Sequence, residues 1–484
     1  MREVNNFTVI GGGTAGCIAA LCLKQAYPQK DVMIIESPTT GIIGVGESST
    51  EHWGQFCRYV GINQLAPIFE ANATFKVGVK FSKWGETDFM HSITDPMDAV
   101  RGTHFKHYAS VISRNKPKDW LQTPRTWQNK FHLSHFNQVN ESASQQYHFD
   151  THALNRFLHH ECNKRDIKVW TDDLKDAILD EDGYMAAVTS DTVEYRGDFF
   201  IDCTGFSRMF VGKKYGVNWK SYADYFPVNS AISFTTGEME EYPKFTKATA
   251  RKNGWNWQIP TQTRTGNGYV YSDKFTSKDE AHREMEEAYG ESLEIAKEFK
   301  FEPGRLEKAW VKNCYAVGLS QSFVEPLEAT SIGSSIQAMF CFLNYFPSWS
   351  AEECNETINS IYENIAEYVQ SHYLTKRTDT KFWESVRYDL KLLPGLAENL
   401  EKWKNRLPNT LDADCPWAMF RGVNYIPILY GLDWFDTHVI KREYINQDYS
   451  GIEGWLDGYR EYESNESLWI GHKQLLNMLL TNTD

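Results

Sequence analysis

The feature that most constrains the fold is a glycine-rich turn close to the N-terminus. The apolar segment 7–10 is typical of a short strand, and Gly11-Gly12-Gly13-Thr14-Ala15-Gly16 follows it directly. Residues 19–23 continue as a helix, and a second strand, 32–35, ends at Glu36. A strand, a GxGxxG turn, a helix, a strand and an acid in this order are typical of a βαβ unit that binds a dinucleotide.

The residues of this motif have distinct physical roles. Gly11 allows the tight turn, Gly13 lets the backbone approach a pyrophosphate, and Gly16 lets helix and strand pack closely. The acid that ends the second strand can accept hydrogen bonds from ribose hydroxyls. The predicted cofactor contacts in this motif are Gly11, Gly13, Thr14, Ala15, Gly16 and Glu36.

Other segments favour FAD over a nicotinamide cofactor. The chain has a single dinucleotide fingerprint, so a second nicotinamide domain is not visible. The segment 44–50 opens a predicted helix and offers more backbone N–H groups for a long cofactor, from Gly46, Glu47 and Ser48. The apolar segment 199–205 predicts a buried strand that returns to the first βαβ unit, as is common in FAD-binding folds. One bound FAD is therefore expected.

Composition narrows the class of protein. A chain of 484 residues is too long for one ordinary core, so two large domains are expected. The net charge of −14 argues against nucleic acid or an anionic membrane as the main partner. The nine cysteines are scattered without a CxxC pair, so we expect no zinc site and a reducing compartment. No signal-peptide core or membrane-length apolar run is evident, which favours a soluble cytoplasmic protein.

The stretch 323–333 has the composition of a reaction centre. Glu325 and Glu328 flank Pro326, and Thr330 and Ser331 stand where a helix should begin. The N–H groups of a helix N-terminus can hold an anion, and small residues in the first turn let a flat ligand approach the backbone. The alternative interpretation is a capped core helix with two solvated glutamates.

Two predicted strands carry further candidates. Alternation in the segment 74–84 puts Lys76 on the face opposite Phe75, which from pattern alone favours an ordinary strand with solvated lysines. A buried lysine facing a cavity would instead be a hydrogen-bond donor or nucleophile. Trp255 and Trp257 share one side of a strand that stops at Pro260, and segment 268–272 is its predicted partner. This aromatic wall could cover a flat ligand or belong to the core.

The hydrophobic pattern of the sequence changes near residue 350, where amphipathic helical periodicity begins. Amphipathic segments at 352–373, 381–393 and 396–406 predict helices, and a terminal helix is expected at 468–480. We therefore divide the chain into a body, 1–350, that binds FAD, and a mostly helical subdomain, 351–484.

Taken together, the motifs resemble those of the flavin-dependent halogenases, in the tryptophan or indole branch and, more weakly, the marine and phage-borne broad-scope members. The WxWxIP signature, which plain flavin monooxygenases lack, matches 255–260. The similarity covers nearly the whole chain. It implies an α/β fold: a FAD-binding, Rossmann-like, flavin monooxygenase-type body with an added mixed or antiparallel sheet and a C-terminal helical subdomain. The matching segments are the GxGxxG turn, Gly44-Val45-Gly46-Glu47, Phe75-Lys76, Trp255-Asn256-Trp257-Gln258-Ile259-Pro260, Phe323-Val324-Glu325-Pro326-Leu327-Glu328 and Arg377-Thr378-Asp379-Thr380.

The resemblance implies that the body, 1–350, also activates halide and that the subdomain, 351–484, covers the substrate. It further implies a mechanism. Reduced FAD, supplied by a separate flavin reductase, reacts with O2 to give a C4a-hydroperoxide, and a halide at the N–H groups of Thr330 and Ser331 attacks it. The resulting hypohalous acid passes Trp255 and Trp257 to Lys76, which presents the halogen to an aromatic carbon. The resemblance further implies Glu328 as the catalytic acid–base partner, Gly318 and Ile332 as cofactor contacts, and a substrate site at His107, Ala109, Pro326, Glu325 and Tyr425.

Departures from the family pattern bear on the substrate. Ala329 and Ser331 stand where tryptophan halogenases usually carry serine and glycine, and Ala109 stands where phenylalanine is common. The region that clamps the amino-acid group of tryptophan matches poorly. We therefore expect halogenation of an indole, a phenol or another electron-rich arene rather than free tryptophan. Heavier halides are easier to oxidise, so bromide or iodide is favoured over chloride.

Two rival functions stay open at this point. A flavin-dependent aromatic monooxygenase would hydroxylate its substrate without halide. A flavoprotein acting as a redox sensor or electron carrier would show product-free reoxidation and no role for Lys76. Neither nucleic acid, membrane nor metal is an expected partner, and a homo-oligomer is allowed.

Overall fold

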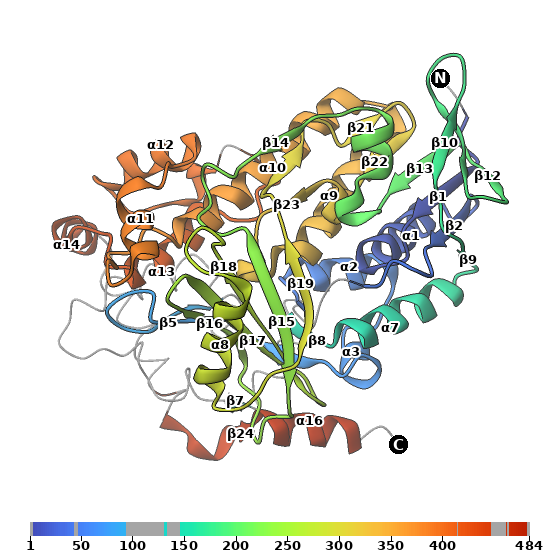
Figure 1. Cartoon of the computed structure of the whole chain (residues 1–484). Helices are drawn as coiled ribbons and strands as arrows, with labels where there is room; N and C mark the ends of the chain where they lie inside the picture. Colours follow the sequence, from blue (N-terminus) through green and yellow to red (C-terminus); the bar gives the residue numbers. More distant parts are fainter. Residues whose placement is uncertain are drawn as a thin grey trace.

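The N-terminal motif lies in a six-stranded, mostly parallel sheet (Figure 1). The computed structural model describes residues 3–42, 47–92, 130–132, 146–413, 415–446, 461 and 464–481. The first strand pairs in parallel with its neighbours on both sides, with Phe7 opposite both Val32 and Phe199. The predicted return strand is therefore confirmed beside the first strand. In order across the sheet, the strands are β21 (Trp310–Val311), β22 (Cys314–Ala316), β13 (Phe199–Asp202), β1 (Asn6–Ile10), β2 (Asp31–Glu36) and β9 (Lys168–Thr171).

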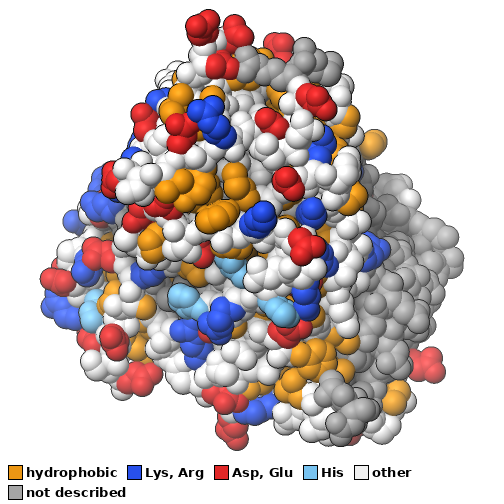
Figure 2. All heavy atoms as spheres, turned by 90° about the vertical axis from the view of Figure 1, so that its right-hand side faces the viewer, with side chains coloured by type: hydrophobic (Ala, Val, Ile, Leu, Met, Phe, Trp, Pro, Cys, Tyr) orange, Lys and Arg blue, Asp and Glu red, His pale blue; other side chains and the backbone are white. Residues whose placement is uncertain are grey.

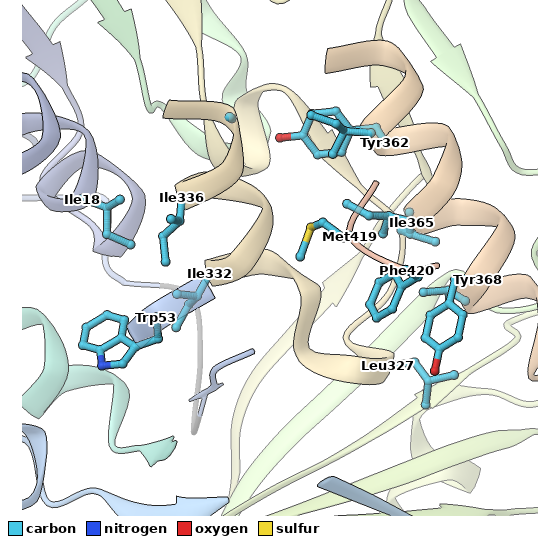
Figure 3. Packing of buried hydrophobic residues seen from close by; sticks show 14 of the residues in the cluster. Ile18, Trp53, Leu327, Ile332, Ile336, Tyr362, Ile365, Tyr368, Met419 and Phe420 are labelled. Carbon is cyan, nitrogen blue, oxygen red and sulfur yellow. The ribbon is translucent and has the colours of Figure 1, made fainter. Parts of the chain in front are cut away.

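Helices pack on this sheet and on one another. The helix α1 (Thr14–Ala26) contacts both α7 (Thr151–Asn163) and α9 (Thr330–Tyr345). Figure 3 shows Ile332 and Ile336 of α9 directed toward Ile18 of α1 and toward Trp53, and all four side chains are buried. The long α9 helix thus joins the cofactor motif to the rest of the core.

The second large sheet is mixed, as expected. The sheet has six pairs of neighbouring strands. β16 and β5 are parallel, and the other pairs are antiparallel. The helix α8 (Lys278–Tyr289) packs on β15 and β18. In order, the strands are β19 (Ile295–Lys300), β15 (Ser230–Thr236), β18 (Thr265–Tyr271), β17 (Gly254–Pro260), β16 (Phe245–Ala250), β5 (Gly78–Ser82) and β6 (Phe89–Ser92).

The segment 74–84 is not the single strand that alternation predicts. It divides into β4 (Thr74–Lys76) and β5, which belong to different sheets. The break is at Val77, whose N–H donates to the carbonyl of Lys244 at 2.7 Å. β4 pairs with β8 (Gln146–Phe149), which also pairs with the short β3 (Glu47–Ser48). Leaving the larger sheet carries the Lys76 side chain into the interior, where only 1% of the residue is exposed.

The four helices predicted after residue 350 are present as α10 (Ala351–Ser371), α11 (Lys381–Asp389), α12 (Pro394–Trp403) and α16 (His472–Thr481). Two further helices, α13 (Gly422–Gly431) and α14 (Thr437–Ile445), were not predicted. Figure 1 shows α11 to α14 gathered at one end of the molecule, whereas α16 lies apart from them. There α16 contacts α3 (Ala66–Glu70) and β7 (Lys130–His132). A domain boundary at residue 350 stays a prediction.

The remaining elements are short. Small sheets are formed by β10 (Asp176–Leu179), β11 (Met185–Thr189) and β12 (Glu194–Arg196), by β14 (Trp219–Ser221), β20 (Gly304–Leu306) and β23 (Ser322–Phe323), and by β24 (Trp469–Gly471) with β7. The helix α2 (His52–Val60) packs against α1 and α9. Acidic and basic side chains are interspersed on the face in Figure 2. In the described part of the chain, no helix is long and apolar enough to cross a membrane.

Candidate active site

A strained turn precedes α9 and carries Glu328. Glu328 has φ 63° and ψ 8°, and Ala329 has φ 55° and ψ 43°. Two successive non-glycine residues in the left-handed region are costly, and such strain is found mostly at functional sites. The turn directs the side chain of Glu328 inward, since only 2% of this residue is exposed. The expectation of solvated glutamates is therefore wrong.

One oxygen of Glu328 is anchored and the other is not. Oε1 accepts hydrogen bonds from Nδ1 of His91 at 2.9 Å, from Nε2 of His372 at 3.1 Å and from the hydroxyl of Tyr368 at 3.5 Å. Oε2 is buried and has no hydrogen-bond partner within the described residues. Burial opposes the charged form, but the two imidazoles outweigh it and hold the pKa of the Glu328 carboxyl well below its usual range. Glu328 is thus a buried carboxylate with one oxygen free to act.

Glu325 is buried nearby in a different environment. Its Oε2 accepts from the indole N–H of Trp255 at 3.3 Å and from the hydroxyl of Tyr373 at 2.8 Å. Its Oε1 has no partner in the part of the chain that the structure describes. Burial raises the pKa of Glu325 to about 8, although both donors act to lower it.

Lys76 is a buried amine near Glu328. Its Nζ donates to the carbonyl of Ser49 at 3.0 Å and to Oγ of Ser48 at 3.3 Å. Burial lowers the pKa of Lys76 to about 8, and the carboxylates of Glu328 and Glu51 partly offset that effect. The interpretation of Lys76 as a solvated strand lysine is wrong, because β4 leaves the sheet that alternation assumed.

A central cavity of about 160 Å³ connects several of the predicted site residues. Trp255 and Trp257 face it from β17, with ring centroids 6.1 Å apart. The Lys76 amine lies behind Ser48, which is part of the cavity wall. The predicted residues in this wall are Glu47, Ser48, Trp255, Trp257, Glu325, Pro326, Glu328, Thr330, Ser331 and Ile332.

The N-terminus of α9 opens onto the same cavity. Its N-cap residue is Ala329, which offers no side-chain cap. The hydroxyls of Ser334 and Ser335 donate hydrogen bonds to the backbone carbonyl of Ser331, at 3.1 and 2.8 Å. The N–H groups of Thr330 and Ser331 have no acceptor within the helix, as in any first turn, so this end of α9 is suited to an anion.

One predicted substrate residue, Tyr425, lies away from the central cavity. Tyr425 on α13 packs against Tyr368 and Trp403, with centroids 5.0 and 4.9 Å apart, and lines a separate polar cavity between α10 and α12. His107, Ala109 and Gly46 lie outside the described residues. The roles given to these residues stay predictions.

The glycines of the N-terminal turn form a cradle that fits FAD. A Cβ at Gly11, where φ is 113°, would lie 2.3 Å from the carbonyl oxygen of Cys203, and one at Gly16 would lie 1.9 Å from that of Gly11. By contrast, a Cβ at Gly13 would meet nothing within 4 Å. The space at Gly13 lies at the N-terminus of α1, which has no side-chain cap. Open space and free N–H groups together suit a pyrophosphate.

The other predicted cofactor residues surround this cradle. Glu36 ends β2 with Oε2 3.5 Å from Nε2 of His159. The hydroxyl of Thr14 donates to Oε2 of Glu47 at 3.5 Å, and burial raises the pKa of Glu47 to about 7. Gly318 has φ 69°, and a Cβ there would lie 2.7 Å from the Cβ of Ala15. These contacts place Glu47 and Gly318 beside the start of α1.

Two glycine substitutions separate cofactor binding from folding. Gly13→Val would fill the open space, so we expect flavin affinity to fall at least about 10-fold, or about 1.4 kcal/mol, with little change in thermal stability. Gly16→Ala would force a Cβ into the turn and should cost about 1–3 kcal/mol of folding stability. Flavin titration and flavin-free thermal unfolding measure the two effects. Equal loss of stability in both variants would contradict this assignment.

Apart from Trp255, the residues that hold the two glutamates have no signal in the sequence. His91 lies on β6, Tyr368 lies on α10, and His372 and Tyr373 follow the end of α10. His91 is 237 positions from Glu328 along the chain, so no local pattern could pair them. Within the described ranges, no group of three or more His, Cys, Asp or Glu side chains could hold a metal ion.

Comparisons with known proteins agree with this geometry. A family model described as tryptophan halogenase matches residues 6–442. The chain is 29% identical to tryptophan 6-halogenase SttH of Streptomyces toxytricini, over 89% of this chain and 90% of the relative. It is 30% identical to 7-chloro-L-tryptophan 6-halogenase KtzR of Kutzneria sp., over 83% of this chain and 85% of the relative.

Solved structures show the same architecture over nearly the full length. A flavin-dependent halogenase from Xanthomonas campestris superposes with a TM-score of 0.86 at 26% identity, covering 99% of this chain and 98% of that one. The crystal structure of SttH gives a TM-score of 0.82 at 27% identity, with 96% and 97% covered. The predicted FAD-binding α/β fold with an added sheet and C-terminal helices is confirmed. The chain belongs to the tryptophan halogenase family of flavin-dependent enzymes, which halogenate aromatic substrates.

Proposed function

We propose that this enzyme halogenates electron-rich arenes of the indole or phenol type, with Lys76 and Glu328 as catalytic residues. The observation that supports this most is a buried lysine close to a buried carboxylate, one oxygen of which has no partner among the described residues, beside a cavity that reaches α9. A lysine and a carboxylate in a desolvated site are an effective acid–base pair. Free tryptophan is not the preferred substrate in this proposal.

The cofactor and the halide occupy the two helix N-termini. FAD is held by the cradle at α1, by Glu36, and by the residues at Gly318 and Ile332, and a separate flavin reductase delivers it in reduced form. When bound, reduced FAD and O2 supply the oxidising equivalent that turns halide into hypohalous acid. The N–H groups of Thr330 and Ser331 hold the halide, because an uncapped helix N-terminus stabilises an anion.

Lys76 receives the oxidised halogen after it crosses the cavity beside Trp255 and Trp257. With a pKa of about 8, the amine is protonated often enough to donate a hydrogen bond to hypohalous acid and neutral often enough to form a haloamine. Ser48 is the cavity residue that contacts the amine, so a small movement of this side chain would open the route. Lys76 then presents the halogen to the aromatic carbon.

Glu328 acts at the arene. Its low pKa keeps it ionised, so Oε2 can stabilise the cationic ring formed on attack and accept the proton released on substitution. His91 and His372 fix Oε1, which orients the free oxygen. We assign Pro326 to the wall of the substrate site and His107 and Ala109 to its aromatic side. Tyr425 would support this side through Tyr368, on which it packs.

The substrate preference rests on departures from the family pattern. Ala329 removes a hydroxyl beside the catalytic carboxylate, and Ser331 is exposed at the halide site where glycine is usual. Both changes alter the cavity that the halide and the reagent share. We extend the proposal to a preference for bromide or iodide, because the heavier halides are more easily oxidised.

Substrate competition tests this proposal. Purified enzyme with FAD, NADH and a flavin reductase would receive equal amounts of indole, a phenol and free tryptophan, each with chloride, bromide or iodide. We expect halogenated indole or phenol with bromide or iodide to dominate the products seen by mass spectrometry. Efficient chlorination of free tryptophan, with little product from the simpler arenes, would contradict the proposed scope. A reaction without enzyme, supplied with hydrogen peroxide, measures the background halogenation.

The second candidate is a flavin-dependent aromatic monooxygenase, which the same FAD cradle could serve. It would form a hydroxylated product without halide. The buried Lys76 and Glu328 favour halogenation, because hydroxylation directly over the flavin requires neither residue. We further propose a cytoplasmic location, since all nine cysteines are free thiols.

A further inference from the structure

Glu325 is a buried titratable group in the central cavity to which the proposed mechanism gives no chemical role. Only 2% of this residue is exposed, and it lines the cavity between the α9 N-terminus and the two tryptophans. Its carboxyl is asymmetric: Oε2 has two donors, and Oε1 has no partner among the described side chains and backbone. An unpartnered polar atom at this depth indicates a ligand, because leaving it unpaired costs free energy.

The hydrogen bonds determine where a proton on Glu325 must lie. The indole N–H of Trp255 is a donor only, so the oxygen that it contacts must accept. The hydroxyl of Tyr373 donates to the same oxygen. A proton on Oε2 would face these two donors, whereas a proton on Oε1 meets none. The neutral acid therefore presents an O–H group from Oε1.

We propose that neutral Glu325 donates a hydrogen bond to the oxygen of hypohalous acid and so retains this reagent between the α9 N-terminus and Lys76. This inference rests on the proposed halogenase function. Trp255 and Tyr373 are then positioning residues, because they fix the oxygen that does not donate. No bond is made or broken at Glu325, and its proton stays on the carboxyl.

The electrostatic surroundings support a neutral group at physiological pH. Burial raises the pKa of Glu325 to about 8. The titratable group that contacts it is Tyr373, whose own pKa is raised well above its usual value by burial and then by Glu325. Glu328 lies three residues away with its carboxylate turned to His91 and His372, which keep it ionised. Two carboxyl groups of one segment are thus held in opposite protonation states, a donor and an acceptor.

The coupling of flavin oxidation to product formation tests this role. Glu325→Gln keeps a neutral donor of the same size, and Glu325→Leu removes it, whereas Glu353→Gln changes an exposed residue of α10 as a matched control. We expect the Gln variant and the control to give halogenated product within about 3-fold of wild type. The Leu variant should give at least about 10-fold less halogenated product at unchanged NADH consumption. An added 1,3-diketone should then capture more free hypohalite than with wild type. The proposal would be overturned if the Leu variant and wild type gave the same amount of halogenated product per NADH consumed. It would also be overturned if the Gln and Leu variants lost the same amount of product.

A second measurement needs no flavin. The raised pKa means that the folded protein retains a proton that the unfolded chain loses above pH about 4.5. Wild-type stability from this group therefore falls as pH rises from about 4.5 to about 8, whereas glutamine does not titrate. The melting temperature of Glu325→Gln minus that of wild type should grow across this window. A difference that stays constant would show an ionised Glu325 and overturn the inference.

The two readouts also separate this inference from the function on which it rests. If wild type makes no halogenated arene at all, the proposed function fails, and the thermal measurement still reports the protonation of Glu325. If wild type halogenates normally, the coupling of the Leu variant decides the inference. A loss of activity at alkaline pH would not by itself test the role of Glu325, because burial also lowers the pKa of Lys76 to about 8.

Discussion

Replacing Lys76 with methionine is expected to lower halogenated product by about 10³-fold, the loss typical of removing a preorganised donor from a desolvated site. Flavin oxidation should continue, because the cofactor cradle and the α9 N-terminus are untouched. Hypohalite should then leave the protein and be captured by an added trap. Product analysis by mass spectrometry, with NADH consumption followed in parallel, measures both effects.

The matched control is Lys80→Met, four residues further along. Lys80 is half-buried on β5, and its Nζ lies 3.4 Å from Oδ2 of Asp88. This variant should retain product formation within about 3-fold. If Lys76→Met still halogenates at the wild-type rate while free hypohalite is trapped, the lysine has no role in transfer.

Stability gives an independent check on the Lys76 environment. The folded pKa of about 8 lies below the unfolded value of about 10.4, so the unfolded chain binds more protons between these values. Wild-type stability from this group should therefore rise as pH increases from about 8 to about 10.4. Lys76→Met lacks this rise and should be at least as stable as wild type at pH 7, because methionine has no charge to desolvate.

Replacing Glu328 with glutamine is expected to lower product formation by about 10²–10⁴-fold, the range for loss of a positioned acid–base group. The amide keeps the size of the side chain but can neither accept the proton from the ring nor stabilise positive charge on it. Hypohalite production should persist. Single-turnover product yield, compared with NADH consumption, checks the prediction.

Two further variants show whether Glu328 acts through its free oxygen. Tyr368→Phe removes the longest of the three contacts at Oε1, 3.5 Å, and should cost much less than Glu328→Gln. Glu328→Asp retains the charge but shortens the side chain, and we expect partial activity. Activity of Glu328→Gln within about 3-fold of wild type would exclude this carboxylate from the proton transfer.

Local sequence patterns predicted the parts of the fold that local interactions determine. The glycine turn, both flanking strands, the return strand at 199–202 and the start of α9 at Thr330 follow from steric needs of the backbone or from periodicity. Of the helices after residue 350, α10, α11, α12 and α16 were predicted from their amphipathic pattern, whereas α13 and α14 were not. The predicted ends of α11 and α12 were too late, because Leu390 and Lys404 leave the helix, and the predicted start of α16 was too early.

The site itself depended on contacts between distant segments. Alternation favoured a solvated Lys76, but the hydrogen bond from Val77 to Lys244 turns the chain into a second sheet and buries the amine. The protonation states of Glu325 and Glu328 could not be predicted either. They differ because burial raises the pKa of Glu325 although Trp255 and Tyr373 act to lower it, whereas His91 and His372 outweigh burial at Glu328 and lower its pKa. The resemblance supplied the candidate residues, and the fold supplied their environments.

The central claim is that Lys76 transfers oxidised halogen to an arene. The most direct test compares wild type with Lys76→Met in a reaction containing indole, FAD, NADH, a flavin reductase, bromide and a hypohalite trap. Wild type should give brominated indole with the bromine isotope doublet, and the variant should lose this product while trapped hypobromite increases. Hydroxylated indole that forms without bromide and is unaffected by the variant would contradict a transfer role for Lys76 and identify a monooxygenase.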